Sequence, residues 1–316
     1  MPPSFVHRIT KYDPADRDER GLYTGVEDTA SDHGPVEAAY LAAIAAFAEA
    51  SGIDRLEIRE PSVTGFLHFG DEPRVEGHGL SGLFPPDLTG YHDGAEVSLP
   101  VALELVRAML RDQGAWCRLE AGDVFTVHVG WDQYVYVGGD RRCTEALART
   151  RELGLFPEPL TASPYAAELA EREVTEAADE DFWARVHMQL ASRQTVLLEE
   201  TYVHNAARWH RLTPENLDTV RAGLGPRALL TVWPDLTPDI GAVLATLPEE
   251  DSVEFVWEAQ DGTIRHAIVY DTEYQQLAAL VADARAACAL TLNVDERRPL
   301  LCAALPDSDG VLRARW

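Results

Sequence analysis

Alternating apolar and polar positions predict the strands of this chain, and apolar positions at helical spacing predict its helices. In one clear case Phe125, Val127 and Val129 alternate with Thr126 and His128. Successive side chains of a strand point to opposite faces, so this segment has one buried face and one wetter face. The same reading along all 316 residues gives an ordered series of elements.

The predicted order of elements, β-α-β-α-β-β-α, occurs twice. The first copy consists of strand 5–10, helix 36–50, strand 55–59, helix 99–111, hairpin 116–137 and helix 143–153. The second copy consists of strand 208–212, a helix opened at 213–215, strand 229–233, a helix opened at 237–239, hairpin 253–269 and helix 273–290. A repeated order is a sign of internal duplication. We therefore predict an α+β fold of two pseudo-duplicated units, each a mainly antiparallel sheet packed against helices.

Domain boundaries follow from the same comparison. Residues 1–160 form the first predicted unit and residues 195–316 the second, with 161–194 as an acidic, helical linker. The first copy alone carries long inserts, at 13–33 and 62–96. Shared elements are expected to be scaffold, whereas unshared loops are where an individual function is expected.

The charge is strongly negative in both halves. The chain has 53 acidic and 27 basic side chains, a formal net charge of −26. Residues 1–160 hold 27 of the acidic and 14 of the basic ones, so the excess is shared evenly. A polyanion would be repelled by most of such a surface, which argues against general affinity for DNA or RNA.

The cellular location and the cofactors are predicted from motifs that are missing from the sequence. No run of about 18 apolar residues is present, so no membrane span is predicted. The start, Met1–Ser4, has no features of a signal peptide. The four cysteines show no CxxC spacing, which favours free thiols and a cytoplasmic protein. The Walker-type P-loop motif, HExxH and GxSxG are also missing, so we predict no cofactor, metal or catalytic residue.

The candidate binding residues lie mainly in the insert 62–96. It is rich in glycine, histidine and aromatic residues, which indicates a binding loop, histidine ligands gathered by flexible backbone, or a compact loop that packs Phe66, Phe69, Leu83 and Phe84 onto the domain. In the hairpin, His128 lies on the wetter face, and Trp131 is either a ligand platform or a lid on the core. The predicted binding residues are His68, His78, Asp87, Tyr91, His92, His128 and Trp131.

The first half resembles a known family. The stretches that carry the likeness are Phe5–Asp13, His33–Tyr40, Gly90–Val97 and Val129–Tyr134. They are similar to a family of uncharacterised actinobacterial proteins that are often labelled RNA-binding proteins. The resemblance covers about residues 1–165, implies an RNA-binding role and assigns no catalytic residue.

Acidity and the missing catalytic motifs favour a non-enzymatic acidic protein that recognises another macromolecule by covering a basic surface of that partner. Immunity proteins, antitoxins and nucleic-acid mimics act in this way. One alternative is association with RNA or the ribosome through a local arginine and aromatic patch. Another is an enzyme that uses the insert 62–96. The sequence does not fix the partner's identity or the oligomeric state.

Overall fold

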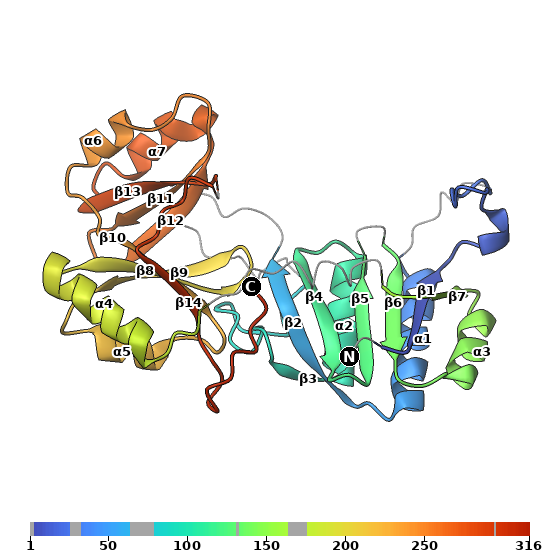
Figure 1. Ribbon diagram of the computed structural model, residues 1–316. Coiled ribbons are helices and arrows are strands. Elements are labelled where there is room, and N and C mark those ends of the chain that lie inside the picture. Colours follow the sequence, from blue (N-terminus) through green and yellow to red (C-terminus); the bar gives the residue numbers. More distant parts are fainter. Residues whose placement is uncertain (1–2, 26–32, 64–78, 131–132, 164–175, 294) are drawn as a thin grey trace. The chain divides into compact units, whose positions relative to one another are not determined.

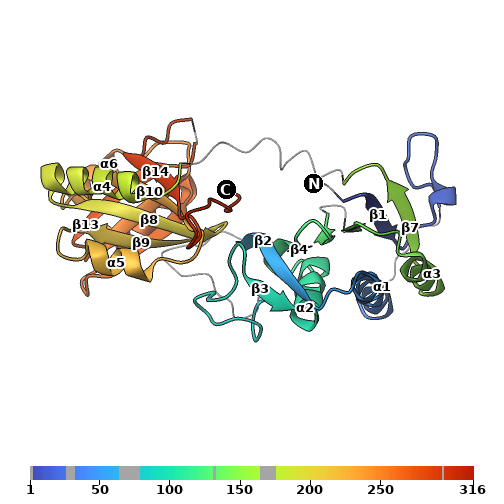
Figure 2. The ribbon, with the colours of Figure 1, turned by 60° about the horizontal axis from the view of Figure 1, so that its bottom comes forward.

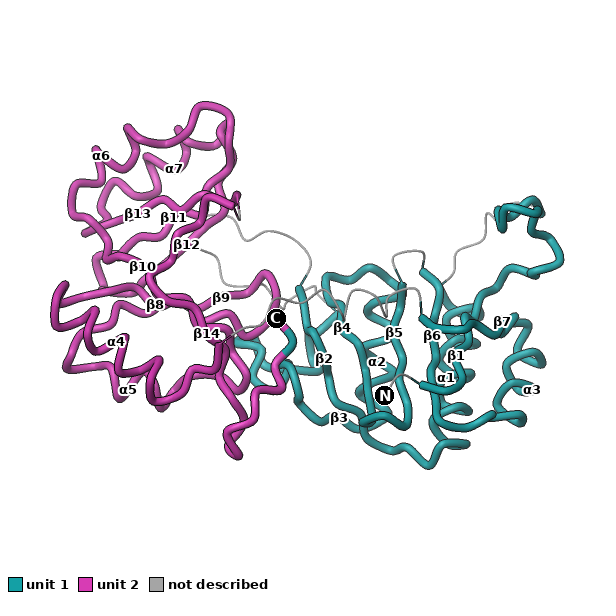
Figure 3. Tube along the Cα trace, in the orientation of Figure 1, with its two compact units in different colours: residues 1–64, 75–173, 315 teal, residues 65–74, 174–314, 316 magenta. Residues whose placement is uncertain are grey.

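The computed structural model describes residues 3–25, 33–63, 79–130, 133–163, 176–293 and 295–316. The fold is α+β, as predicted, and every described strand pairing is antiparallel (Figure 1). The chain divides into two compact units (Figure 3). Of the described residues, the first unit holds those up to 163 together with Arg315, and the second holds 176–314 and Trp316.

The first unit is built on one seven-stranded sheet. Its elements are β1 (Phe5–Thr10), α1 (Pro35–Ser51), β2 (Arg55–Val63), β3 (Glu96–Ser98), α2 (Leu99–Leu110), β4 (Ala115–Ala121), β5 (Phe125–Val129), β6 (Val135–Gly139), α3 (Thr144–Glu152) and β7 (Phe156–Leu160). The strand order is β3-β2-β4-β5-β6-β1-β7. The meander β4-β5-β6 therefore lies in the middle, and β1 pairs beyond it.

The helices of this unit cover one face of the sheet. Helix α2 contacts β4 and β5, and α1 contacts β6 and the other two helices (Figure 2). Phe125, Val127 and Val137 are buried toward them, and each such side chain contributes about 2 kcal/mol to folding. Alternation turns the residues between them to the opposite face of the sheet. We call it the helix-free face, because the described helices of the first unit lie on the other side of the sheet.

A buried carboxylate joins the two long helices. Glu37 of α1 accepts hydrogen bonds from Nε of Arg107 at 2.9 Å and Nε of Arg111 at 2.6 Å, both from α2. The Arg111 hydrogen bond is the main cause that lowers the pKa of Glu37. The helix layer is thus fixed by charge-assisted hydrogen bonds as well as by apolar packing.

The second unit contains two smaller sheets. Its elements are α4 (Glu180–Arg193), β8 (Val196–Val203), β9 (Ala206–Leu212), α5 (Leu217–Gly223), β10 (Leu229–Pro234), α6 (Ile240–Ala245), β11 (Val253–Glu258), β12 (Ile264–Val269), α7 (Tyr274–Leu280), β13 (Ala286–Thr291) and β14 (Leu301–Ala304). The sheets have the orders β14-β10-β8-β9 and β12-β11-β13. Leu197, Trp209 and Trp233 of the first sheet pack against Val256 and Ala286 of the second.

The structure does not confirm the predicted duplication. One unit has a single seven-stranded sheet, whereas the other divides its strands between two sheets with different orders. The expected linker 161–194 is also divided. Its described part from Glu180 onward is α4, which contacts β8 and β14 of the second unit. Residues 164–175 lie outside the described residues.

Two predicted elements need correction. The helix expected over 273–290 ends at Leu280, and Ala286–Thr291 is instead strand β13, paired with β11. Its alanine-rich sequence favours a helix, but pairing and burial override that local preference. The sequence pattern predicts no strand after helix 143–153, but Pro157 and Pro159 lie within β7, whose partner among the described strands is β1. An edge strand tolerates proline, because on its outer side no backbone N–H is needed to pair with another strand.

Among the described residues, no helix is both long enough and apolar enough to cross a membrane.

Candidate functional site

Polar side chains from neighbouring strands line up across the helix-free face of the first unit. Arg59 of β2 stands opposite Arg118 of β4. His128 of β5 stands opposite Tyr136 of β6, which in turn stands opposite Arg8 of β1. Residues directly opposite each other in a sheet share a face and lie within contact distance. The antiparallel meander therefore brings together residues far apart in the sequence.

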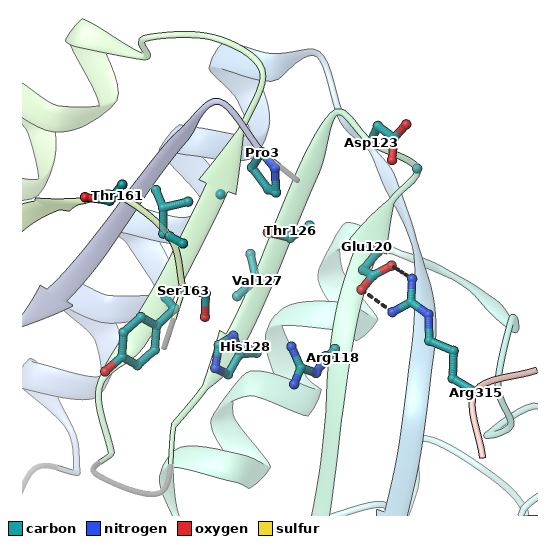
Figure 4. Close-up of a pocket in the computed structure, with 15 residues that line it drawn as sticks. Pro3, Arg118, Glu120, Asp123, Thr126, Val127, His128, Thr161, Ser163 and Arg315 are labelled. Carbon is teal, nitrogen blue, oxygen red and sulfur yellow. Dashed lines mark hydrogen bonds and ion pairs between the residues drawn. The ribbon is translucent and has the colours of Figure 1, made fainter. Parts of the chain in front are cut away.

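A pocket of about 600 Å³ lies on this face (Figure 4). Its walls come from Val6, Arg118, Thr126, His128 and Tyr136 of the sheet. Its remaining walls are formed by Pro3, Glu120, Gly122, Asp123, Val127, Gly138, Thr161, Ala162, Ser163 and Arg315. The exposed surface of the pocket is mostly apolar, with hydroxyl and charged groups among it. This size and composition are typical of pockets that bind a small molecule or one large side chain.

The depth of the pocket depends on a glycine in β6. Gly138 stands opposite Thr126 and Val6 in the sheet. A Cβ atom at position 138 would lie 2.5 Å from Thr126 Oγ1 and 2.8 Å from Pro3 Cγ. At the neighbouring Gly139 the nearest atom would be 3.6 Å away, an ordinary contact. Position 138 therefore excludes any side chain unless the pocket wall moves.

The arginines of this face are already bound by carboxylates. Nε of Arg118 donates to Oε2 of Glu60 at 3.0 Å, and both side chains are buried. Nε of Arg59 donates to Oδ1 of Asp93 at 3.0 Å. Arg8, farther along the row, donates from Nη2 to Oε2 of Glu158 at 2.9 Å. At the pocket wall, Arg315 binds Glu120 through two hydrogen bonds, as Figure 4 shows.

A β-bulge in β2 makes these ion pairs possible. The register with β4 shifts between Arg59 and Ser62, and Glu60 has a φ of 52°. A positive φ costs energy for a residue with a side chain, and it persists only where surrounding contacts enforce it. Here Asp93 accepts the backbone N–H of Glu60 at 3.0 Å as well as the Arg59 hydrogen bond. Asp93 thus anchors the bulge that aims Glu60 at Arg118.

The histidine of the row is held as a neutral ring. His128 stacks on Tyr136 with 5.0 Å between the ring centroids and 11° between the planes. Burial, and secondly the charge of Arg118, lower the pKa of His128 to about 3. The ring is therefore uncharged at neutral pH, and it presents an aromatic, polarisable wall to the pocket rather than a cation.

The structure places one of the predicted binding residues, His128, in the pocket wall. Asp87 is exposed, and its side chain accepts the backbone N–H of Thr89 at 3.1 Å. His92 is half-buried, with its Nδ1 3.0 Å from the carbonyl oxygen of Asp93. His68, His78 and Trp131 lie outside the described residues, as do Phe66 and Phe69.

Tyr91 lies in the core of the first unit. It is fully buried, and its hydroxyl donates to the carbonyl oxygens of Trp116 at 2.8 Å and Ser62 at 3.2 Å. Burial raises its pKa well above the usual value. Leu80 and Leu88 are buried with it, and Phe84 packs against its ring. In the described part of the insert 62–96, Leu80, Leu88 and Tyr91 are therefore core residues of the first unit.

Sequence reasoning missed most of the pocket. Arg118 was not singled out, because a charged residue on a half-buried strand usually points to solvent. Gly138 did carry a signal, since a glycine inside a strand often marks the close approach of another group. The walls at Pro3 and Thr161–Ser163 come from segments beside β1 and β7, and nothing in the sequence pattern joins them to β5.

No group of three or more histidine, cysteine or acidic side chains among the described residues is arranged to hold a metal ion. Comparisons of the chain with protein-family models, with curated proteins and with solved structures found no match.

Proposed function

We propose that this protein is a non-enzymatic binding protein that recognises a basic macromolecular partner at the helix-free face of the first unit. The observation that carries the proposal is the pocket on this face: its surface is mostly apolar, and the arginines beside it are already paired with carboxylates. Such a pocket suits an apolar side chain of a partner, because one well-packed anchor supplies much of the binding energy of an interface.

Electrostatics favour a basic partner over a phosphate-bearing one. The chain carries a net charge of −26, so a basic surface is attracted over a long range. A phosphate group would have to displace Glu60 from Arg118 or Asp93 from Arg59. Leaving a buried carboxylate without its cation is strongly unfavourable. Asp123, exposed at the pocket, suits a basic residue beside the apolar anchor.

The alternatives draw less support from the described residues. Stacking of RNA bases needs exposed aromatic faces, but His128 and Tyr136 are only 6% and 3% exposed and stack on each other. The enzyme alternative depends on the insert 62–96, where His68 and His78 lie outside the described residues.

Selection from a library of short random peptides tests the proposal. The full-length protein is immobilised, and the bound peptides are sequenced. We expect enrichment of peptides in which an aromatic or aliphatic residue is flanked by lysine or arginine. The Gly138→Ala variant, whose new methyl group forces Thr126 and Pro3 to move, should retain at least tenfold fewer of these peptides. Gly139→Ala is the matched control and should retain them.

Three results would overturn the proposal. The first is enrichment of acidic or uncharged peptides, and the second is equal retention of basic peptides by both glycine variants. The third comes from fluorescence anisotropy with labelled single-stranded RNA. Binding of this RNA that weakens steeply with added salt would favour the RNA-binding alternative instead.

A further inference from the structure

The second unit contains a buried group of charged and aromatic side chains between its two sheets. Glu199 lies on β8 and Trp233 on β10 of the four-stranded sheet. Glu254 and His266 lie on β11 and β12 of the three-stranded sheet. Arg297 joins them from the segment between β13 and β14. Here these five residues are called the inter-sheet cluster.

The cluster holds a guanidinium group in a defined way. Nη2 of Arg297 donates to Oε2 of Glu254 at 2.6 Å. Its Cζ atom lies 5.0 Å from the centroid of the Trp233 ring. A carboxylate on one side and an indole face on the other are the two groups that recognise a guanidinium best. The side chain of Arg297 is a quarter exposed, so its place can be reached from solvent.

A second carboxylate makes the cluster richer in acid than its own arginine requires. Glu254 binds Arg297 and, 3.2 Å from its Oε1, His266. Glu199 makes no ion pair among the described residues, and its Oε2 accepts the indole N–H of Trp233 at 2.8 Å. Burial, and secondly the charge of Glu254, raise the pKa of Glu199 to about 7. An additional or stronger cation would stabilise its charged form.

A buried donor beside the cluster lacks an acceptor. Trp209 stands opposite Glu199 in the sheet, and its ring centroid lies 6.1 Å from that of His266. The side chain is 7% exposed, and its Nε1 makes no hydrogen bond within the described residues. A buried indole N–H normally has a partner. A peptide carbonyl of a bound segment is the kind of acceptor that would complement it.

We propose that the inter-sheet cluster is an arginine-recognition site, in which Arg297 is an intramolecular occupant that a partner protein's arginine replaces. Arg297 is suited to exchange because residues 295–299 belong to no helix or strand, so its departure breaks no strand pairing. The site goes beyond the pocket of the first unit and does not depend on it.

Calorimetric titration of the full-length protein with blocked arginine, N-acetyl-arginine methylamide, tests the proposal. The blocked citrulline analogue has nearly the same shape without the charge and serves as the ligand control. Wild type should bind the arginine probe weakly but saturably, because the probe competes with Arg297. Arg297→Ala removes the competitor and should bind it at least tenfold more tightly. Neither protein should bind the citrulline analogue comparably.

Two further variants separate recognition from a merely structural ion pair. Arg298→Ala alters the exposed neighbour and should bind the probe as wild type does. Glu254→Gln in the Arg297→Ala background should lose the probe. If Arg297→Ala does not fold, Arg297→Met keeps the apolar stem and takes its place. Equal binding of both probes, or binding of arginine by Arg297→Ala that is absent or no tighter than in wild type, would overturn the proposal.

Discussion

Arg118 and Glu60 form a hydrogen-bonded ion pair at 3.0 Å, in which both side chains are less than a tenth exposed. The pair connects β4 to the bulge of β2, directly beside the pocket. Because water cannot screen either charge effectively, each depends on the other for its stability. Ion pairs of this kind neutralise the arginines of the helix-free face.

Removing one member of this pair should be costly. We expect Arg118→Met to lower the free energy of unfolding by roughly 3 kcal/mol, because it leaves Glu60 buried without its main cation. Denaturant unfolding of the full-length protein measures the loss. Arg55→Met is the control: its ion pair with Glu96 is about half exposed, so the change should stay below about 0.5 kcal/mol. Equal losses in both variants would show that burial does not govern the strength of these pairs.

The neutral state of His128 predicts a loss of stability in acid. Its pKa is about 3 in the folded protein and 6.5 in an unfolded chain. Between these values the unfolded chain binds a proton that the folded protein does not, so stability falls as the pH is lowered. The loss should reach roughly 2 kcal/mol at about pH 5, where many proteins still fold.

Comparison of two histidine variants isolates this effect. His128→Gln should unfold in urea with a smaller change in stability between about pH 7 and pH 5 than wild type. His187→Gln alters an exposed histidine of α4 and should leave the wild-type slope in place. If the stability of His128→Gln changes with pH as steeply as that of wild type, the His128 ring of wild type is protonated in the folded protein.

The insert residue Tyr91 should matter for stability rather than for binding. Its hydroxyl makes two hydrogen bonds to backbone carbonyls in the core, at Trp116 and Ser62. We expect Tyr91→Phe to lose about 1–2 kcal/mol of stability, because these carbonyls lose a donor without access to water. The folded variant should capture the same peptides as wild type. Loss of capture with normal stability would instead support the prediction from sequence that Tyr91 binds a partner.

The sequence predicts local elements well and their association poorly. The sequence predicts strand Phe5–Thr10 with the bounds that it has in the structure, where its apolar residues Val6 and Ile9 are buried. It cannot predict that β1 pairs with both β6 and β7, since those pairings join residues more than a hundred positions apart. The predicted duplication is not confirmed for the same reason: the elements of the two units are assembled into sheets of different strand order.

The candidate site shows the same limit. His128 was predicted from its place on the wetter face of one strand, and that face does line the pocket. Its neutral state depends first on burial, which the sequence pattern does not predict, and secondly on the charge of Arg118. The role of Glu60 beside the site is not predicted, because it depends on a bulge and a positive φ. No glycine next to Glu60 indicates that conformation in the sequence.

The inter-sheet cluster predicts a pH effect of opposite sign. The pKa of Glu199 is about 7 in the folded protein against an ordinary value of 4.5. Between these values the folded protein keeps a proton that the unfolded chain has lost, so stability falls as the pH rises and then levels off above about pH 7. The full difference is roughly 3 kcal/mol. Glu254 does not share this window because, although burial opposes it, His266 and Arg297 keep its pKa below the usual value.

Replacing the titrating group should remove the effect. Glu199→Gln keeps an acceptor for the Trp233 N–H but cannot ionise, so its stability should exceed that of wild type increasingly from about pH 5 to pH 7. Glu249→Gln changes an exposed carboxylate and should follow the wild-type curve. Urea unfolding across this range measures all three proteins. If the free energies of unfolding of Glu199→Gln and wild type differ by the same amount at every pH, Glu199 is already ionised at pH 5. The inter-sheet cluster then already balances its charge. A difference that grows with pH would show that Glu199 keeps its proton in the folded protein up to about pH 7, so that a partner's arginine would favour its charged form.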